Sequence, residues 1–269
     1  MTPFLARHEH FARVDSTNDV VRAWLAAGTS ELCLATADEQ TAGRGREGRR
    51  WVAPPGAALL LSLGFRPTWL EPERVWRLAA LVSLAMAEAS EVVAWLPSGT
   101  IRLKWPNDLV IATDPSEVRK LAGVLGETDG LGTADPRVVV GIGLNAAWAA
   151  ADFPPDLAAT MTSLSEAAGD RPVDLARLLH LFLARLEPSV EALRAGHFDG
   201  AAWEDRQVTT GRMIRLEAPY GNEVVRALGV NAWTGALVVD DSTSATGRRN
   251  VLVGEIHHVR LAEPIADAV

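Results

Sequence analysis

The chain has 269 residues, of which 48% are hydrophobic and 22% are charged, a composition typical of a globular protein and not of a disordered one. Its net charge of −8 argues against a protein whose main role is to coat nucleic acid, although this net charge does not exclude a local basic patch. Cys33 is the only cysteine, which excludes internal disulfides and a multi-cysteine zinc site. We therefore expect a reducing compartment.

The sequence carries no sign of secretion or membrane insertion. Its start, Met1–Phe11, lacks the long apolar run of a signal peptide. The most apolar stretches, Ala57–Phe65 and Leu78–Met86, are too short to cross a bilayer. These observations predict a soluble, cytoplasmic protein.

The first predicted element is a helix over Asp15–Gly28. Ser16 or Thr17 can cap this helix, and Gly28 can end it. A short buried strand, Leu32–Ala37, follows, and Ala58–Phe65 is apolar at consecutive positions, like a strand covered on both faces. The intervening residues 38–56 are rich in glycine and proline and have no apolar period. A loop of this length inside a compact domain is usually functional or disordered.

The next elements alternate between strands and helices. Periodicity predicts one helix from Pro72 to about Glu91 and another from about Val173 to Ala195, which Pro188 should kink or divide. Four strands are predicted between them, over Ile101–Trp105, Leu109–Ala112, Lys120–Glu127 and Arg137–Leu144.

After about Arg206 the pattern changes to short alternating runs separated by turn signals. These runs are Arg212–Glu217, Glu223–Val230, Ala236–Val239 and Val251–Arg260. Such a pattern predicts a small antiparallel barrel. The expected fold is α+β, with a strand-and-helix domain over residues 1–207 and a small all-β domain over 208–269.

The most informative segment is Gln40–Trp51. It places four arginines among three glycines, which suits a mobile loop that wraps a carboxylate or a phosphate. A basic solvated loop or a salt-dependent nucleic-acid patch would have the same composition. Gly43, Gly45 and Gly48 match the dinucleotide-binding fingerprint in letters, but Pro54 and Pro55 prevent the helix that this fingerprint must open.

Both lysines of the chain, Lys104 and Lys120, lie within seventeen positions of each other, although the chain has 24 arginines. A lysine that persists in such a background is a candidate for contacting one oxygen as a compact point charge. Lys104 precedes a turn, Trp105–Asp108, and Lys120 begins an apolar strand. Neither lysine lies in a Walker A motif.

With these motifs in order, the chain resembles the biotin–protein ligases, also called biotin–[acetyl-CoA-carboxylase] ligases. The matching residues are Asp15–Asn18, Gln40–Trp51, Lys104–Asp108, Lys120–Gly123 and Gly141–Asn145, within a resemblance that covers roughly residues 12–262. The resemblance implies a catalytic domain with a mixed sheet related to class II aminoacyl-tRNA synthetases, followed by an SH3-like β-barrel.

The implied reaction has two steps and depends on ATP and Mg²⁺. The carboxylate of biotin attacks the α-phosphorus of ATP, which gives biotinyl-5′-AMP and pyrophosphate. A lysine amine on a biotin carboxyl carrier domain then takes the acyl group and releases AMP. The implied partner is that carrier, with no nucleic acid or membrane, and the chain is expected to be a monomer or a homodimer.

The resemblance also implies roles for individual residues. The biotin site would comprise Ser16, Thr17, Asn18, Gln40, Gly43, Arg44, Gly45, Arg46, Lys120 and Gly123. The nucleotide site would comprise Arg46, Arg49, Trp51, Lys104, Asn107 and Asn145, with Asn145 recognising adenine. Lys120 would be the main catalytic cation, and Arg46 would lie between the carboxylate and the α-phosphate. We expect no metal site built from protein side chains, and we interpret Asp108 as a turn residue, with assistance to the metal as the alternative.

Two alternatives stay open. A lipoate–protein ligase shares the fold and the adenylation chemistry, but we expect it to carry a different arginine–glycine motif. A non-catalytic module that binds biotin or nucleic acid would keep the loop without needing Lys120. Because the first motif begins at Asp15, we expect no N-terminal helix-turn-helix domain of the kind that makes related ligases repressors.

Overall fold

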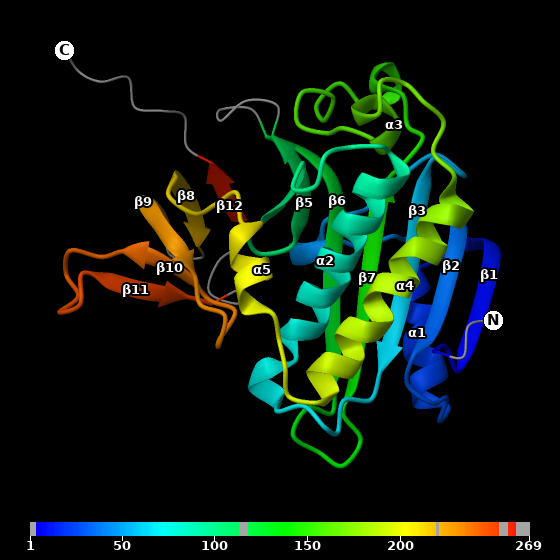
Figure 1. The fold of residues 1–269 in the computed structure, drawn as a ribbon, viewed down its shortest axis with the longest axis horizontal. Helices are drawn as coiled ribbons and strands as arrows, with labels where there is room; N and C mark the ends of the chain where they lie inside the picture. Colours follow the sequence, from blue (N-terminus) through cyan, green and yellow to red (C-terminus); the bar gives the residue numbers. More distant parts are fainter. Residues whose placement is uncertain (1–3, 113–117, 219–220, 253–257, 262–269) are drawn as a thin grey trace.

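The structure is a computed structural model that describes residues 4–112, 118–218, 221–252 and 258–261. It contains a seven-stranded mixed sheet with helices on both faces, followed by a five-stranded antiparallel sheet (Figure 1). This arrangement confirms the predicted α+β class. The last predicted strand, Val251–Arg260, lies partly outside the described residues, which include only positions 251, 252 and 258–260 of it.

The large sheet has the strand order β1-β2-β3-β7-β6-β5-β4. Its first pair, β1 and β2, is parallel, and the other neighbours are antiparallel. All eight residues of β3 are buried, as its consecutive apolar residues predict. The strands are β1 (Arg7–Val14), β2 (Cys33–Gln40), β3 (Ala58–Phe65), β4 (Ile101–Lys104), β5 (Asp108–Ala112), β6 (Val118–Asp129) and β7 (Arg137–Asn145).

The helices divide between the two faces of this sheet. Helix α1 packs on β2, β3 and β7, whereas α2 lies on the opposite face and packs against α4 (Figure 1). The α1 face therefore stays largely open beside its single helix. The helices are α1 (Thr17–Ala26), α2 (Trp76–Val93), α3 (Leu164–Ala167), α4 (Leu175–Arg194) and α5 (Gly200–Asp205), with 3₁₀ turns at Arg46–Gly48, Pro72–Arg74 and Ala150–Asp152.

The second sheet has the order β11-β10-β9-β8-β12. Its strands are β8 (Met213–Ala218), β9 (Gly221–Val230), β10 (Leu237–Asp240), β11 (Arg248–Val251) and β12 (His258–Leu261). Segments next to its strands bond to the large-sheet part of the chain: for example, the indole Nε1 of Trp105 donates to the Gly235 carbonyl at 2.9 Å, and the Leu103 carbonyl accepts from the Val208 N–H at 2.8 Å. Most buried apolar residues of the two sheets form one cluster, and a second, smaller cluster joins α1 to Cys33, Ala35 and Val139 of the large sheet.

Two features differ from the sequence-based expectation. Strand β1 was not predicted, because most of its side chains are polar and an edge strand that is exposed along much of its length lacks an apolar period. Helix α4 is a single helix through Pro188, which is exposed, so of the two predicted effects of this residue, a kink or a division, the division does not occur. Phe182 and Leu186 before the proline and Val190 after it are all buried, and this shared packing face keeps the helix continuous.

No helix in the described part of the chain is both long and apolar enough to cross a membrane.

One buried ion pair joins α2 to the segment that leads into the second sheet. The Glu91 carboxylate accepts from Arg206 at 2.8 and 3.1 Å and from the Ile101 N–H at 2.9 Å. Only 4% of the Glu91 side chain and 12% of the Arg206 side chain are exposed.

We predict that Arg206→Ala lowers the free energy of unfolding by about 3 kcal/mol or more, because it leaves a buried carboxylate without its counter-charge. Urea denaturation followed by circular dichroism measures this loss. Arg13→Ala is the control, because Arg13 is 66% exposed in its ion pair with Glu39 and its loss should cost less than about 1 kcal/mol. Equal losses in the two variants would show that the buried pair between Glu91 and Arg206 stabilises the fold no more than an exposed pair does.

Candidate active site

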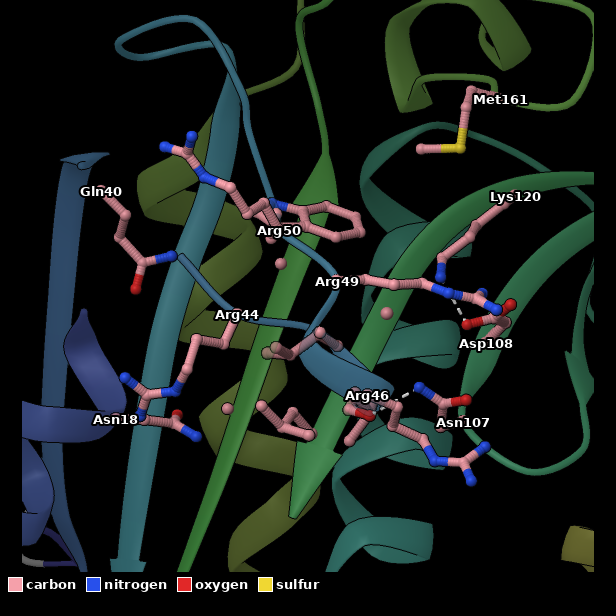
Figure 2. A pocket seen from close by; sticks show the side chains of 18 of the residues that line it. Asn18, Gln40, Arg44, Arg46, Arg49, Arg50, Asn107, Asp108, Lys120 and Met161 are labelled. Carbon is pink, nitrogen blue, oxygen red and sulfur yellow. Dashed lines mark hydrogen bonds and ion pairs between the residues drawn. The ribbon is translucent and has the colours of Figure 1, made fainter. Parts of the chain in front are cut away.

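The sequence motifs meet at one cavity of about 560 Å³ on the α1 face of the large sheet (Figure 2). We call residues 41–56, which follow β2 and close one side of this cavity, the flap. Thirteen of the fifteen predicted site residues line the cavity: Ser16, Thr17, Asn18, Gln40, Arg44, Gly45, Arg46, Arg49, Trp51, Lys104, Asn107, Lys120 and Gly123.

One end of the cavity is a network of uncharged polar groups at the start of α1. The Gln40 Oε1 accepts from the Thr17 N–H at 2.7 Å and lies 3.0 Å from the Thr17 hydroxyl. The Ser62 hydroxyl lies 2.7 Å from that of Thr17 and donates to Asn18 Oδ1 at 2.5 Å. Thr17, Asn18 and Ser62 are all buried, so their conformations are fixed before any ligand arrives.

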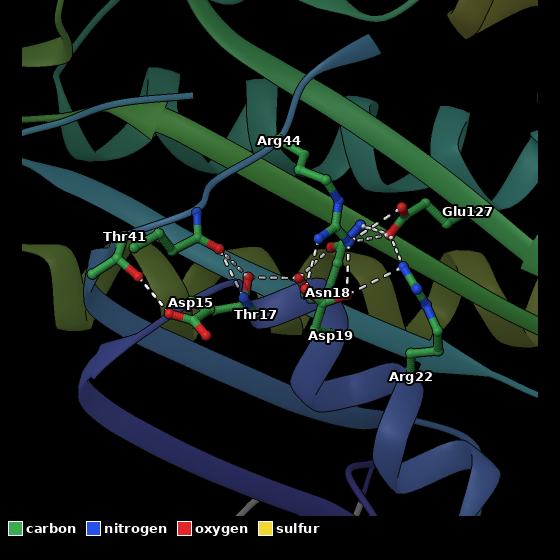
Figure 3. A network of polar contacts seen from close by, with 10 residues as sticks. Asp15, Thr17, Asn18, Asp19, Arg22, Thr41, Arg44 and Glu127 are labelled. Atoms are coloured by element: carbon green, nitrogen blue, oxygen red, sulfur yellow. Dashed lines mark hydrogen bonds and ion pairs between the residues drawn. The ribbon is translucent and has the colours of Figure 1, made fainter. Parts of the chain in front are cut away.

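The first arginine of the flap, Arg44, is held by two carboxylates. Arg44 donates to both oxygens of Asp19 at 2.6 and 2.8 Å and reaches Glu127 at 3.2 Å (Figure 3). The hydrogen bond from Arg44 holds the pKa of Asp19 below its usual range, against the opposing effect of burial. Arg44 is thus part of a clamp between the flap and α1.

The flap covers the floor of the cavity with the indole of Trp51. A Cβ atom at Gly143 would lie 2.5 Å from this ring, and one at Gly123 would lie 3.2 Å from it. Both glycines therefore permit the indole to lie directly against the sheet. The group that packs against these glycines of β6 and β7 is thus a side chain of the same chain.

Lys120 lies where β6 is irregular. Val110 pairs with Lys120 and Leu109 pairs with Ala122, so Leu121 is an extra residue in β6 and forms a bulge. The Nζ atom of Lys120 is 2.6 Å from Asp108 Oδ1 and 5.7 Å from the centre of the Trp51 ring. The bulge and the carboxylate together direct the amine into the cavity (Figure 2).

Arg46 is well shielded from solvent. Only 16% of its side chain is exposed, compared with 35% for Arg44. Burial lowers the pKa of its guanidinium, although the charges of Glu47 and Asp108 act in the opposite direction. A guanidinium that has already lost part of its water interacts more strongly with an incoming anion than a solvated one does.

Two predicted residues do not line the cavity. Gly43 shapes the flap, since its carbonyl accepts from the Trp51 N–H at 2.9 Å and a Cβ atom there would lie 2.5 Å from the Trp51 carbonyl. Asn145 is fully buried at the end of β7, and its Nδ2 donates to the Thr162 carbonyl at 3.1 Å. In this arrangement Asn145 holds the segment that leads to α3, and its proposed contact with adenine stays a prediction.

Several groups at the site were missed in the sequence. Ser62, Asp19 and Glu127 support the site without carrying a motif of their own, and Leu157 and Met161 line the cavity from a segment with no sequence signal. For Glu127, a charged residue on an otherwise apolar predicted strand was the available signal. The others could be found only from three-dimensional proximity.

The charge of the cavity is strongly positive. Six cationic side chains among the described residues line it, and Asp108 is the only carboxylate there: Arg44, Arg46, Arg49, Arg50, Lys104 and Lys120 are the cations. Within the described ranges no group of three or more His, Cys, Asp or Glu side chains could hold a metal. A single carboxylate is compatible with Mg²⁺ bound mainly through the phosphate oxygens of a nucleotide.

Comparison with known proteins agrees with this geometry. The family model for the biotin/lipoate A/B protein ligase family matches residues 10–145. A biotin–[acetyl-CoA-carboxylase] ligase from Mycobacterium tuberculosis is 34% identical over 253 residues, which cover 93% of this chain and 88% of the relative. The chain belongs to the biotin/lipoate A/B protein ligase family.

Two further relatives place this ligase among characterised folds. The bifunctional ligase/repressor BirA of Bacillus spizizenii is 29% identical over 220 residues, which cover 81% of this chain and 65% of BirA. The solved structure of the biotin protein ligase from Aquifex aeolicus in complex with biotin and ATP is similar with a TM-score of 0.77 and 25% identity, over 95% of this chain and 99% of that one. All fifteen predicted site residues of this ligase lie within the matched residues 10–145.

We predict that Gly143→Ala opens the flap of this ligase, because the new methyl group would collide with the Trp51 indole. The flap contains four arginines, so its opening should speed cleavage by trypsin between residues 44 and 50. Limited proteolysis followed by mass spectrometry measures the rate of this cleavage.

Gly126→Ala is the matched control, because no atom lies within 4 Å of a Cβ there and Gly126 pairs on the same ladder between β6 and β7. It should leave the cleavage rate unchanged. If trypsin cleaved the flap of Gly143→Ala no faster than that of the unsubstituted protein, Trp51 would not be the residue that holds the flap against the sheet.

Proposed function

We propose that this chain is an ATP-dependent biotin–protein ligase that forms biotinyl-5′-AMP and transfers biotin to a lysine of a biotin carboxyl carrier domain. One observation carries the proposal: a single cavity joins an uncharged polar end, around Thr17, Asn18 and Gln40, to a cationic end, around Arg46 and Lys120. The first end suits the polar ring of biotin, and the second suits the meeting point of a carboxylate and a polyphosphate.

The chemical need for the cations follows from the first step. A biotin carboxylate oxygen forms a bond to the α-phosphorus of ATP while the bond to the bridging oxygen breaks, and pyrophosphate leaves with its electron pair. Two anions must therefore approach each other, and preorganised positive groups lower the cost of that approach. In our proposal, Lys120 and Arg46 lie beside the reacting oxygens, and Arg49 and Lys104 bind the phosphates.

The second step needs the mixed anhydride to be protected. The carrier amine attacks the acyl carbon, the bond to the phosphate oxygen breaks, AMP leaves, and the amine loses a proton. Water would compete with the amine in an open site. The flap, which crosses the cavity with Trp51 and Arg46, is the element that we expect to exclude water.

The nucleotide requires Mg²⁺ in this proposal. Asp108 is the residue that would help to hold the ion, which would neutralise phosphate charge and support pyrophosphate as a leaving group. Asp108 lies at the end of the turn that begins after Lys104, so we propose that its contact with Lys120 also keeps that amine in place.

We also propose a division into two domains and a cellular location. Residues 1–207 would carry the catalysis and residues 208–269 an SH3-like domain, which the antiparallel order of five strands supports. We propose a cytoplasmic location, consistent with Cys33 as a buried free thiol. The test of the whole proposal is incubation with ATP, Mg²⁺, a carrier domain and either radiolabelled biotin or radiolabelled lipoate. Label on the carrier from lipoate alone would overturn it.

Lys120→Ala is predicted to reduce biotinyl-AMP formation by roughly a hundredfold or more while the protein stays folded, because it removes a preorganised positive charge beside the reacting oxygens. Single-turnover formation of labelled biotinyl-AMP, with circular dichroism as the measure of folding, tests this effect. Arg215→Ala, which removes an exposed cation of β8, is the control. Unimpaired adenylation in Lys120→Ala would reject the assigned role.

Arg46→Ala is predicted to weaken biotin retention and to let the intermediate escape, because the flap loses its buried contact with the cavity. The measurement starts from enzyme loaded with preformed biotinyl-AMP and follows AMP release without a carrier, so that a slower first step in the variant does not mask hydrolysis of the intermediate. We expect a several-fold rise in this rate over the unsubstituted enzyme. An unchanged rate would count against the flap as a lid.

A further inference from the structure

Glu127 lies behind the polar end of the cavity and does not line it, yet it accepts hydrogen bonds from two side chains that do line it and from a third on α1. Its Oε2 receives Asn18 Nδ2 at 2.7 Å, Arg22 at 2.9 Å and Arg44 at 3.2 Å (Figure 3). These donors come from α1 and from the flap, whereas Glu127 itself lies on β6. One carboxylate therefore joins three separate segments that border the cavity.

The contact with Asn18 fixes which way its amide points. An ionised carboxylate can only accept hydrogen bonds, so the Asn18 group that faces Glu127 must be the NH₂. The Oδ1 atom then faces the Ser62 hydroxyl, which donates to it at 2.5 Å. Gly141 leaves room for this orientation, because a Cβ atom there would lie 2.1 Å from Asn18 Oδ1.

The Gln40 amide also has one orientation, which its contacts with Thr17 determine. Since the single hydroxyl proton of Ser62 goes to Asn18, the Thr17 hydroxyl must donate its own proton to Ser62 or to Gln40. Gln40 Oε1 also accepts the Thr17 N–H, so this oxygen is committed to the start of α1. The Nε2 of Gln40 is then the donor that remains for a ligand.

Glu127 also restrains Arg44, together with Asp19. Burial acts to raise the pKa of Glu127, but hydrogen bonds from Asn18 and Arg44 and the charges of Arg44 and Arg22 outweigh it, and the pKa lies below its usual value. The carboxylate is thus ionised throughout the neutral range, and the acceptor that orients Asn18 is permanent there.

We propose that Glu127 is a positioning residue that presets the biotin end of the cavity, and this inference rests on the proposed function. Its negative charge fixes the Asn18 amide and, through it, the direction of the Ser62 hydroxyl proton, so that Asn18 Oδ1 and the Thr17 hydroxyl oxygen lie as acceptors beside the Gln40 Nε2 donor, which the Thr17 N–H sets separately. A cyclic urea carries one carbonyl acceptor and two N–H donors, and this set of groups complements it. Glu127 acts only through these side chains and does not touch the ligand.

The decisive variant is Glu127→Gln, which keeps the shape of the side chain but removes its charge and adds an NH₂ group that can face Arg44 and Asn18. We expect the Kd for biotin, measured by calorimetry without nucleotide, to rise about tenfold or more, as for the loss of a hydrogen bond to a charged group. The Kd for ATP without biotin should stay within about twofold. In steady state, KM for biotin should rise while kcat at saturating biotin is largely kept.

Glu127→Asp keeps an acceptor-only anion and should recover part of the affinity for biotin. Asp129→Asn is the matched control, because Asp129 lies two residues along β6, is exposed and pairs with Arg137 away from the cavity. It should bind biotin normally.

Three results would overturn the inference. Biotin binding by Glu127→Gln equal to that of the unsubstituted protein would show that the charge orients nothing. Equal weakening of biotin and ATP binding would indicate a general structural role. Failure of the unsubstituted protein to bind biotin would refute the proposed function itself, and the role of Glu127 with it, so the two failures are distinguishable.

Discussion

Repulsion between positive charges is the constraint on which the rest of the site depends. Six cations line one cavity of an otherwise acidic protein, and without a bound anion they would push one another apart and drive the flap into solvent. Carboxylates that pair with two of these cations reduce this repulsion, and of these Asp108 lines the cavity while Asp19 and Glu127 do not. Asp19 and Glu127 hold Arg44, and Asp108 holds Lys120. Arg44 and Lys120 are thereby held in fixed directions, and Asp19 and Glu127 also pair with Arg22.

The sheet supplies the rigid frame that this balance requires. The cavity lies over β6 and β7, two long antiparallel strands near the middle of the large sheet, whose opposite face is covered by α2. The glycines at positions 123, 141 and 143 have no Cβ atom on the open face. Lys120 and Trp51 can therefore lie close to the backbone at Gly123, Asn18 at Gly141 and Trp51 at Gly143. The charged groups are thus carried by strands that cannot shift far, and the adjustable part is the flap.

Much of this arrangement was predictable from the sequence, and the parts that were not share a physical cause. Thirteen of the residues that line the cavity could be selected from the sequence because their motifs combine unusual residues at close spacing, such as arginines between glycines or a lysine at the start of an apolar strand. Strand β1 was missed because a polar edge strand lacks the periodicity that marks burial. Asp19 and Glu127 lie far apart in the sequence and meet only through the fold, so no local pattern could assign them to Arg44. Asn145 was placed by analogy of motif, and the structure places it behind the cavity with its amide bonded to Thr162.

The turn between β4 and β5 is anchored from both sides. Asn107 bonds to Val124 of β6 through both its side chain and its carbonyl, while the Trp105 N–H donates to Thr209 and the Trp105 indole donates to Gly235. The position of Asp108, and hence of the Lys120 amine, is therefore set partly by Thr209 and Gly235 from the C-terminal part of the chain. Removing the C-terminal part of the chain would deprive this turn of its outer support, so the cavity depends on that part even though the residues that line the cavity all lie between Ser16 and Met161.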